Sequence, residues 1–254
     1  MFKGLFLLIS GIIRLTFFTL LFTVIFHTWV IKQLLTYSLR HVLGTEVLIQ
    51  EVKMDWRNTG FEVRNLDIIN PEGFPRDRLA DIPLVIVSVD LDSLRRGKIR
   101  LKALGLNLRE LQVMNVPMKG LNVLELKPIQ KAKEAEGSVG ALSKPRSQDR
   151  AKSLDLFIDE LIFSVGEITY LDMRSGVAKK SSFHAGIRGA TYYDIQGADD
   201  MVVIVVTEAL KKMGFVFLNT QIQKIRDRYL SSPPNSEGFF NRAVSFIKEK
   251  LSGP

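Results

Sequence analysis

The side chains that most often carry catalysis or bind metal ions are few in this chain and far apart. The 254 residues include three histidines, His27, His41 and His184, and no cysteine. A thiol nucleophile, a thiolate metal site and a disulfide are therefore excluded, and histidines this widely spaced do not suggest a shared metal ion. The sequence also lacks a Gly-x-Ser-x-Gly elbow, a glycine-rich phosphate loop and a His-Glu-x-x-His pair. We expect no enzymatic activity, no cofactor and no bound metal.

One pair of carboxylates has a spacing that would suit acid–base chemistry. Asp90 and Asp92 are two residues apart, so both side chains would lie on one face of a β-strand. They alternate with Val89 and Leu91, which predicts that Asp90 and Asp92 form the solvated face of a half-buried strand. We therefore expect no catalysis at this pair.

The positive charge of the chain favours anionic partners. Lys and Arg number 35 against 27 Asp and Glu, which gives a formal net charge of +8 and a pI near 9.6. Nucleic acid, lipid headgroups and acidic proteins all fit this charge. The basic residues are spread along the chain and are not interleaved with aromatic residues on one surface, so we do not expect nucleic acid as a partner.

The N-terminal part of the chain has the composition of a membrane anchor. Residues 4–31 are almost continuously apolar, and residues 15–31 approach the roughly 20 residues that cross a hydrocarbon core. Arg14 interrupts the run but can extend to the interface. A cleavable signal peptide would have an apolar core of about 7–15 residues and a small-residue cleavage site. An uncleaved anchor with a juxtamembrane helix, together residues 1–43, fits better.

The orientation of this anchor follows from its flanks. The basic residues on its two sides are nearly balanced, so the positive-inside rule alone decides little. A short basic N-terminus before a span and a long domain usually stays in the cytoplasm, which would send the rest of the chain across the membrane.

Alternation with a period of two replaces the apolar run after residue 44. Strands are predicted at residues 45–54, 61–68, 84–91, 99–103, 106–113 and 121–126, with no helix between them. Consecutive strands without intervening helices form hairpins rather than βαβ units. Residues 44–126 therefore predict an antiparallel meander.

The segment INPEGFP, residues 69–75, predicts a rigid corner at the end of a strand. Pro71 holds Asn70 extended, Gly73 can adopt a positive φ, and Pro75 delays the next strand. Phe74 is expected to pack under the sheet edge, because packing satisfies an aromatic ring in a tight turn. We predict a structural role for Asn70, Pro71, Gly73 and Phe74.

The second half of the chain continues the sheet and ends in helices. Residues 127–152 predict a linker or mobile loop that can include a short helix at 130–136. Alternation resumes over residues 153–197, where two strands are expected to meet at Gly166. Residues 198–254 predict helices at 201–213, 219–230 and 238–251, with Asp199 or Asp200 as the first N-cap. The last is basic and amphipathic, and we expect it to pack on the protein rather than on a membrane.

These elements give a fold class of α+β, mainly β. The predicted architecture is an N-terminal transmembrane helix, an elongated curled antiparallel sheet and C-terminal helices that pack on it.

The order of these features resembles the N-terminal repeat of the AsmA-like proteins. The resemblance rests on short segments in a fixed order: Gly44-Thr45, Gly60, the Asn-Pro-Glu-Gly-Phe corner at 70–74, residues 89–94, residues 97–99 and Gly-Leu-Asn-Val-Leu at 120–124. It covers residues 44–126. Residues 157–176 repeat the pattern of a strand, a Gly-centred turn and a returning strand that ends in Asp.

The resemblance implies a bridge-like lipid carrier, in which a curled sheet cradles acyl chains between the inner and outer membranes of a bacterium. It implies a single-pass inner-membrane protein with its main domain in the periplasm. Its partners would be membrane lipids, and envelope proteins or further copies of itself. A curled sheet that does not close also leaves an apolar inner face. The candidate lipid-binding residues on that face are Val47, Ile49, Phe61, Val63, Val85, Val87, Val89, Ile99, Leu101, Leu156, Ile158, Ile168 and Tyr170.

Two hypotheses for function follow. In the first, the protein binds or helps transfer lipid in cell-envelope assembly, although roughly ten strands about 4.8 Å apart would make a trough of only about 50 Å. In the second, its own helices fill the sheet, and the protein is a non-enzymatic envelope scaffold that binds protein partners at an exposed edge strand. An open apolar cavity would favour the first hypothesis, and a filled sheet would favour the second.

Overall fold

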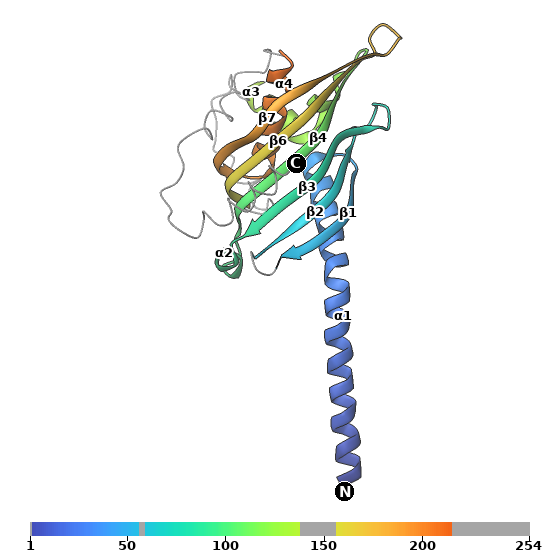
Figure 1. Ribbon diagram of the computed structural model, residues 1–254, viewed down its shortest axis with the longest axis vertical. Coiled ribbons are helices and arrows are strands. Elements are labelled where there is room, and N and C mark those ends of the chain that lie inside the picture. The colour runs from blue at the N-terminus through green and yellow to red at the C-terminus, as the bar shows by residue number, and fades with distance from the viewer. Residues whose placement is uncertain (1, 56–58, 138–155, 215–254) are drawn as a thin grey trace.

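The computed structural model describes residues 2–55, 59–137 and 156–214, without the side chains of residues 2–10, 13, 20–27 and 135–137. One mixed sheet of seven strands forms its centre, and a long N-terminal helix extends from it (Figure 1). The strands are β1 (Val47–Asp55), β2 (Gly60–Ile69), β3 (Arg78–Val89), β4 (Ile99–Val116), β5 (Gly120–Leu121), β6 (Leu156–Asp172) and β7 (Lys179–Gln196). The helices are α1 (Phe2–Leu43), α2 (Leu91–Arg95), the 3-10 helix η1 (Asn122–Glu125), α3 (Lys127–Gly137) and α4 (Ala198–Lys212). The predicted α+β, mainly β class is confirmed.

The first four strands form the predicted antiparallel meander, pairing in chain order. Two predicted boundaries are wrong. Residues 99–103 and 106–113 belong to one strand of 18 residues, β4, and the strand predicted at 121–126 is β5 followed by η1. The side chain of Asn122 ends β5, because its Oδ1 accepts hydrogen bonds from the backbone N–H groups of Met114 and Val123 at 2.8 and 2.9 Å.

The second half of the sheet departs from the antiparallel prediction. β6 pairs with β4 in parallel, and β7 then pairs with β6 antiparallel. A parallel neighbour requires a crossover connection, and the connection from β4 to β6 includes α3. The turn predicted at Gly166 is also wrong, because β6 continues through this residue. A Cβ atom at Gly166 would lie 2.9 Å from the carbonyl oxygen of Arg109, so the glycine permits the close approach of β4.

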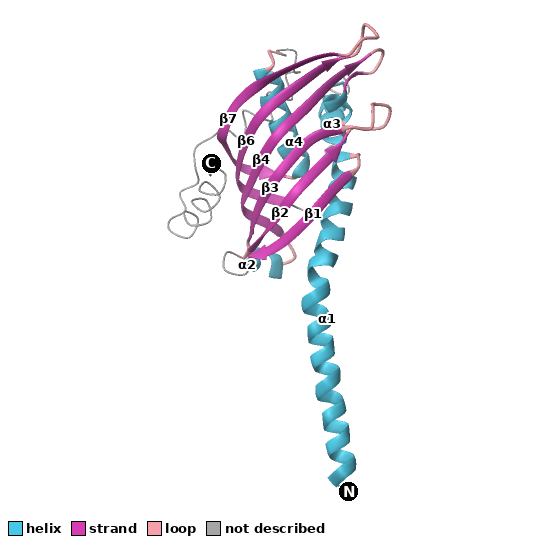
Figure 2. Cartoon of the chain, turned by 45° about the vertical axis from the view of Figure 1, so that its right-hand side comes forward, coloured by secondary structure: helices cyan, strands magenta, loops and turns pink. Residues whose placement is uncertain are grey.

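Irregularities shared by neighbouring strands keep one face of the sheet apolar along its length. The buried apolar positions switch phase between Ile49 and Val52 in β1, and between Leu66 and Val63 in β2. The two switches coincide, since Ile49 pairs with Leu66 and Val52 pairs with Val63. Each switch places two residues, instead of one, between successive buried positions. In β2, Asn65 accommodates this with a backbone φ of 49°, a conformation that asparagine tolerates well. Such irregularities bend strands, and the sheet curls (Figure 2).

Three helices pack on this apolar face, which we call the helix-covered face. They share one core with the sheet and contribute Ile31, Leu35, Leu39 and Leu43 from α1, Ile129 and Ala132 from α3, and Val203, Ile204, Ala209 and Leu210 from α4. The helix predicted at 201–213 is confirmed as α4, but its N-cap is Gly197, and Asp199 and Asp200 lie in its first turn. A helix, α3, is also present where one was expected within the predicted linker. The helices predicted at 219–230 and 238–251 lie outside the described residues.

α1 is a single helix of 42 residues. Over the residues that the structure describes, no helix combines the length and the apolar composition that crossing a membrane requires. The C-terminal part of α1 packs on the sheet from Ile31 onward, and the rest projects past the end of the sheet where α2 lies (Figures 1 and 2). We call this end the α2 end.

Candidate functional site

Strand pairing brings the thirteen predicted lipid-binding residues to the helix-covered face. One row across the sheet runs through Phe61, Val87, Leu104, Leu161 and Tyr192. The next row toward the α2 end joins Val89, Leu101 and Ile158, and Ile99 pairs with Leu156 beyond it. The alternation in the sequence therefore located this face, and the structure adds what lies against it.

Burial divides these thirteen residues into two groups. Seven are buried, among them Val47, Ile158 and Ile168 at 0% exposed, because the helices cover them. Six are half-buried. One of the six, Tyr170, lies near the far end of the sheet, where its hydroxyl accepts a hydrogen bond from Asn115 at 3.1 Å.

The other five half-buried residues gather at the α2 end. Together with Met54 they form the apolar rim, which we define as Met54, Phe61, Val89, Ile99, Leu101 and Leu156. Each lies at the end of its strand nearest α2. The helix-covered face is thus filled by the protein's own helices over most of its length, and five of the six half-buried predicted residues lie toward this end.

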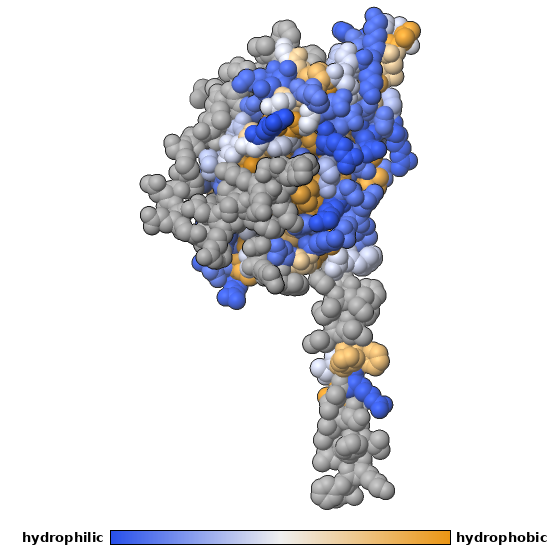
Figure 3. All heavy atoms as spheres, in the orientation of Figure 1, coloured by the Kyte–Doolittle hydropathy of each residue, from blue (hydrophilic) through white to orange (hydrophobic). Residues whose placement is uncertain are grey.

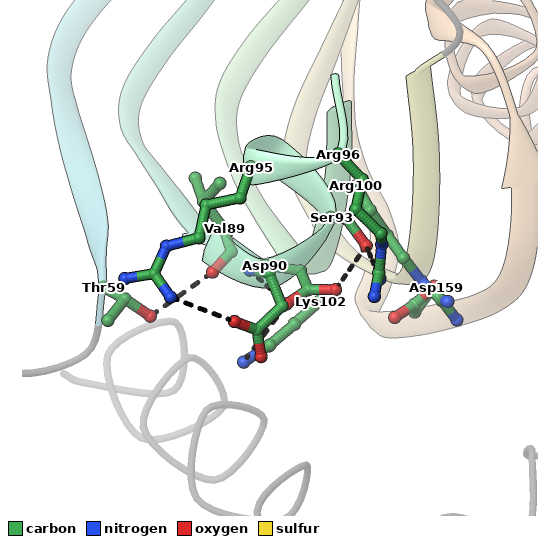
Figure 4. Close-up of polar contacts among 10 residues, drawn as sticks. Thr59, Val89, Asp90, Ser93, Arg95, Arg96, Arg100, Lys102 and Asp159 are labelled. Atoms are coloured by element: carbon green, nitrogen blue, oxygen red, sulfur yellow. Dashed lines mark hydrogen bonds and ion pairs between the residues drawn. The ribbon is translucent and has the colours of Figure 1, made fainter. Parts of the chain in front are cut away.

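The polar side chains beside the rim belong to α2 and the strands that flank it (Figure 4). Asp90 is the N-cap of α2 and accepts hydrogen bonds from the backbone N–H of Asp92 at 3.2 Å and the hydroxyl of Ser93 at 2.6 Å. The Ser93 hydrogen bond is the main reason that the pKa of Asp90 is lowered. The predicted strand face carrying Asp90 and Asp92 is therefore wrong, since β3 ends at Val89 and the carboxylate caps a helix.

The sequence did carry a signal for α2. An Asp followed by a short run ending in Arg-Arg-Gly fits an N-cap, a basic last turn and a glycine after the helix. Gly97 indeed adopts a φ of 74°. The alternation around Asp90 concealed this signal.

A buried ion pair joins β4 to β6 at the same end of the sheet. Arg100 donates a hydrogen bond from Nε to Asp159 at 2.7 Å, and the Asp159 side chain is only 5% exposed. Burial raises the pKa of Asp159, while the Arg100 hydrogen bond and charge oppose that shift. The same hydrogen bond raises the pKa of Arg100. Within the described residues, no group of three His, Cys, Asp or Glu side chains could hold a metal ion.

The two edges of the sheet differ. Along β1, α1 covers the edge: Lys32 donates to the carbonyl of Gln50 at 3.0 Å, and Arg40 donates to that of Val47 at 3.2 Å. β7 is the opposite edge. Its first residues, 179–182, are exposed, and Gly186 and Gly189 interrupt it with positive φ. Lysines and bulges of this kind discourage strand addition.

The predicted corner at residues 69–75 is present at the far end of the sheet. Gly73 has a φ of 89°, and Phe74 is buried at 9% exposed, as expected. The sequence did not reveal its buried partner: Asn122 donates to Oδ1 of Asn70 at 2.7 Å. Packing of Phe74 and the hydrogen bond between Asn70 and Asn122 thus hold the corner in place.

The comparisons with known proteins give no further guidance. No family model matches the chain, and neither a curated protein nor a solved structure matches it. Function has to be inferred from the residues and the geometry.

Proposed function

We propose that the chain is a membrane-anchored, non-enzymatic protein that binds lipid acyl chains at the apolar rim and contributes to cell-envelope assembly as a short AsmA-like protein. The observation that carries this proposal is the position of the rim. It is a half-buried part of the helix-covered face, and it lies at the end of the sheet from which α1 projects (Figure 1).

The proposed anchor rests on the apolar composition of residues 4–31, because the described residues alone contain no candidate span. The length and surface of α1 are compatible with it. About 30 residues precede Ile31, and at 1.5 Å per residue they extend about 45 Å, close to the thickness of a bilayer with its headgroups. The projecting part exposes large apolar side chains, seen as orange surface in Figure 3, with Leu15, Phe17 and Phe18 at 62–70% exposed. Water is a poor solvent for such a surface, and lipid is a suitable one.

The rim is suited to acyl chains rather than to a polar ligand. Its six members are apolar and come from five neighbouring strands, so their side chains offer apolar surface and no hydrogen-bonding groups. A chain held there would stay close to a bilayer that surrounds α1. Six paired strands about 4.8 Å apart span only about 24 Å, so the protein would not bridge two membranes by itself.

The proposed location follows from the anchor. The N-terminus lies in the cytoplasm, α1 crosses the bacterial inner membrane once, and the sheet lies in the periplasm. Lipids, and envelope proteins or further copies of the chain, are the proposed partners.

Site-specific photo-crosslinking tests the proposal on the full chain. Phe61 is replaced by benzoyl-phenylalanine, which keeps the phenylalanine ring and adds a photoreactive benzoyl group, and the protein is reconstituted into phospholipid vesicles. Irradiation should add the mass of one phospholipid at position 61. The same amino acid at Leu48, an exposed apolar residue of β1 at 45%, is the control and should add little. Equal labelling at both positions, or none at Phe61, would exclude the rim as a lipid site.

The scaffold hypothesis remains the second candidate. The burial of most of the helix-covered face by α1, α3 and α4 favours it. β7 is the edge it would use, since α1 covers β1, but the lysines and bulges of β7 disfavour strand addition there. Crosslinks from residues of β7 to another protein, without lipid labelling at Phe61, would support this candidate instead.

A further inference from the structure

The turn between β3 and β4 exposes apolar and basic side chains together. Leu91 and Leu94 of α2 are 45% and 49% exposed. Arg95, Arg96 and Lys98 are exposed beside them. Two exposed leucines within a basic turn are unfavourable in water. They suit a bilayer interface, where apolar side chains enter the acyl region and cations meet anionic headgroups.

In the part of the chain that the structure describes, the charge of this turn is only partly balanced, because Arg100 pairs with Asp159 and Lys102 lies 4.0 Å from Asp90. Residues 90–102 contain five basic and two acidic side chains. Arg95 lies 3.7 Å from Asp92, but both are about four-fifths exposed, so this pair contributes little. Within the described residues, Arg96 and Lys98 form no ion pair. Arg96 donates to the hydroxyl of Ser93 at 3.2 Å, which holds its guanidinium beside the turn (Figure 4).

The position of the turn relates it to the bilayer. α2 lies at the same end of the sheet as the projecting part of α1 and the apolar rim (Figures 1 and 2). If α1 crosses a bilayer, the membrane surface lies below this end of the sheet, and the turn is one of the parts of the domain nearest to it.

We propose that the α2 turn, residues 91–98, is a docking surface for an anionic phospholipid bilayer. This inference rests on the proposed anchor for the placement of the bilayer. Docking adds a second point of attachment beside α1, and two attachments hold the sheet at a fixed tilt with the rim facing the lipid. A single helix would leave its own tilt in the bilayer free, and the sheet packed on it would tilt with it.

Fluorescent labels on the full chain test the docking surface separately from the anchor. The chain has no cysteine, so single cysteines can be labelled with an environment-sensitive dye at Leu94, at Phe18 and at Met118. Phe18 lies on the projecting part of α1 and is 65% exposed, and Met118 is fully exposed at the far end of the sheet. The protein is reconstituted into nanodiscs of phosphatidylcholine with or without phosphatidylglycerol, and quenching by brominated lipid is measured.

The expected pattern has three parts. The Phe18 label is quenched in both kinds of disc, the Leu94 label is quenched strongly only with phosphatidylglycerol, and the Met118 label is quenched in neither. Quenching at Phe18 without quenching at Leu94 would overturn the docking surface and leave the anchor intact. An absence of quenching at Phe18 would overturn the anchor and with it the inference.

A charge variant gives an independent measurement. In the Leu94-labelled protein, replacing Arg95, Arg96 and Lys98 by Gln should lower the ratio of docked to undocked protein by roughly 100-fold, at roughly fivefold per charge. The change affects exposed side chains only, so the fold should be kept.

The matched control removes three exposed lysines at the far end of the sheet, Lys119, Lys179 and Lys180. It lowers the net charge by the same amount and should leave quenching at Leu94 unchanged. Equal losses in the two triple variants would show that total charge, and not the α2 turn, governs the contact.

Discussion

Removing Arg100 should reveal how strongly the buried ion pair holds the α2 end of the sheet. Arg100→Met keeps a side chain of similar length but leaves the Asp159 carboxylate, 5% exposed, without its guanidinium. A hydrogen bond to a charged group contributes about 1.5–3 kcal/mol, and water can replace part of it because Arg100 is 49% exposed. We expect a loss of about 2 kcal/mol in the free energy of unfolding at pH 7. That corresponds to about 4–8 °C in Tm for a domain of this size.

The loss should depend on pH in a direction that follows from the pKa of Asp159. Burial raises this pKa above its ordinary 3.8, and the charges of Asp194 and Asp90 raise it further. The hydrogen bond and the charge of Arg100 lower it and so limit the rise. Without Arg100 the pKa in the folded protein rises further. A carboxyl group with a raised folded-state pKa favours folding fully below the unfolded pKa, and this contribution is lost as the pH passes through the folded value. The deficit of Arg100→Met should therefore shrink as the pH falls from 7 toward about 4.

Thermal unfolding of the full chain in detergent micelles, followed by far-ultraviolet circular dichroism, measures both effects. The double variant with Asp159→Asn should recover part of the loss at pH 7. Arg109→Met is the matched control on the same strand, because its partner Asp81 also binds Arg78 at 3.2 Å. It should cost less than about 1 kcal/mol. A deficit of Arg100→Met that is equal at both ends of the pH range would refute the reasoning.

Three further changes test other parts of the fold. Asn122→Ala leaves two buried backbone N–H groups without an acceptor and should lower the free energy of unfolding by about 3 kcal/mol, measured by chemical denaturation. Gly166→Ala places a Cβ atom 2.9 Å from the Arg109 carbonyl oxygen and should lower it by about 1–3 kcal/mol in the same assay. Arg174 lowers the pKa of Asp172 to about 2 through its hydrogen bonds, so an NMR titration should show this carboxyl ionised down to about pH 2 and the Arg174→Gln variant titrating higher.

The strands and their apolar face were predictable because alternation with a period of two depends only on which face is buried. Val85 and Val87 show this directly, since both lie on the helix-covered face where the pattern placed them. The parallel pairing of β4 with β6 was not predictable in the same way. A strand with one buried face has the same pattern beside a parallel and an antiparallel neighbour, and the crossover that distinguishes them runs through a segment of low hydrophobicity.

The candidate site was predictable only as a face. Val47 and Leu101 both fit the alternation of a half-buried strand, but the structure buries the first completely and leaves the second only half-buried. What covers each residue depends on where α3 and α4 pack, and no local pattern records that. The α2 turn was missed for a related reason, because Asp90 satisfies both the alternation of a strand and the chemistry of an N-cap.

The free energies of burial decide how far along the sheet a lipid can reach. An acyl chain that leaves a bilayer for an apolar protein surface exchanges one apolar environment for another and gains little. Moving α4 away would expose Val203, Ile204 and Leu210, each of which is at most 1% exposed. The free energy cost is about 1.5–3 kcal/mol for each of these side chains, and exposing their neighbours adds to it. The transfer of the chain offsets none of this, and the total approaches the whole stability of a typical domain. The apolar rim carries no such penalty, because its side chains are already partly exposed, so lipid binding should be confined to the α2 end while α4 stays in place.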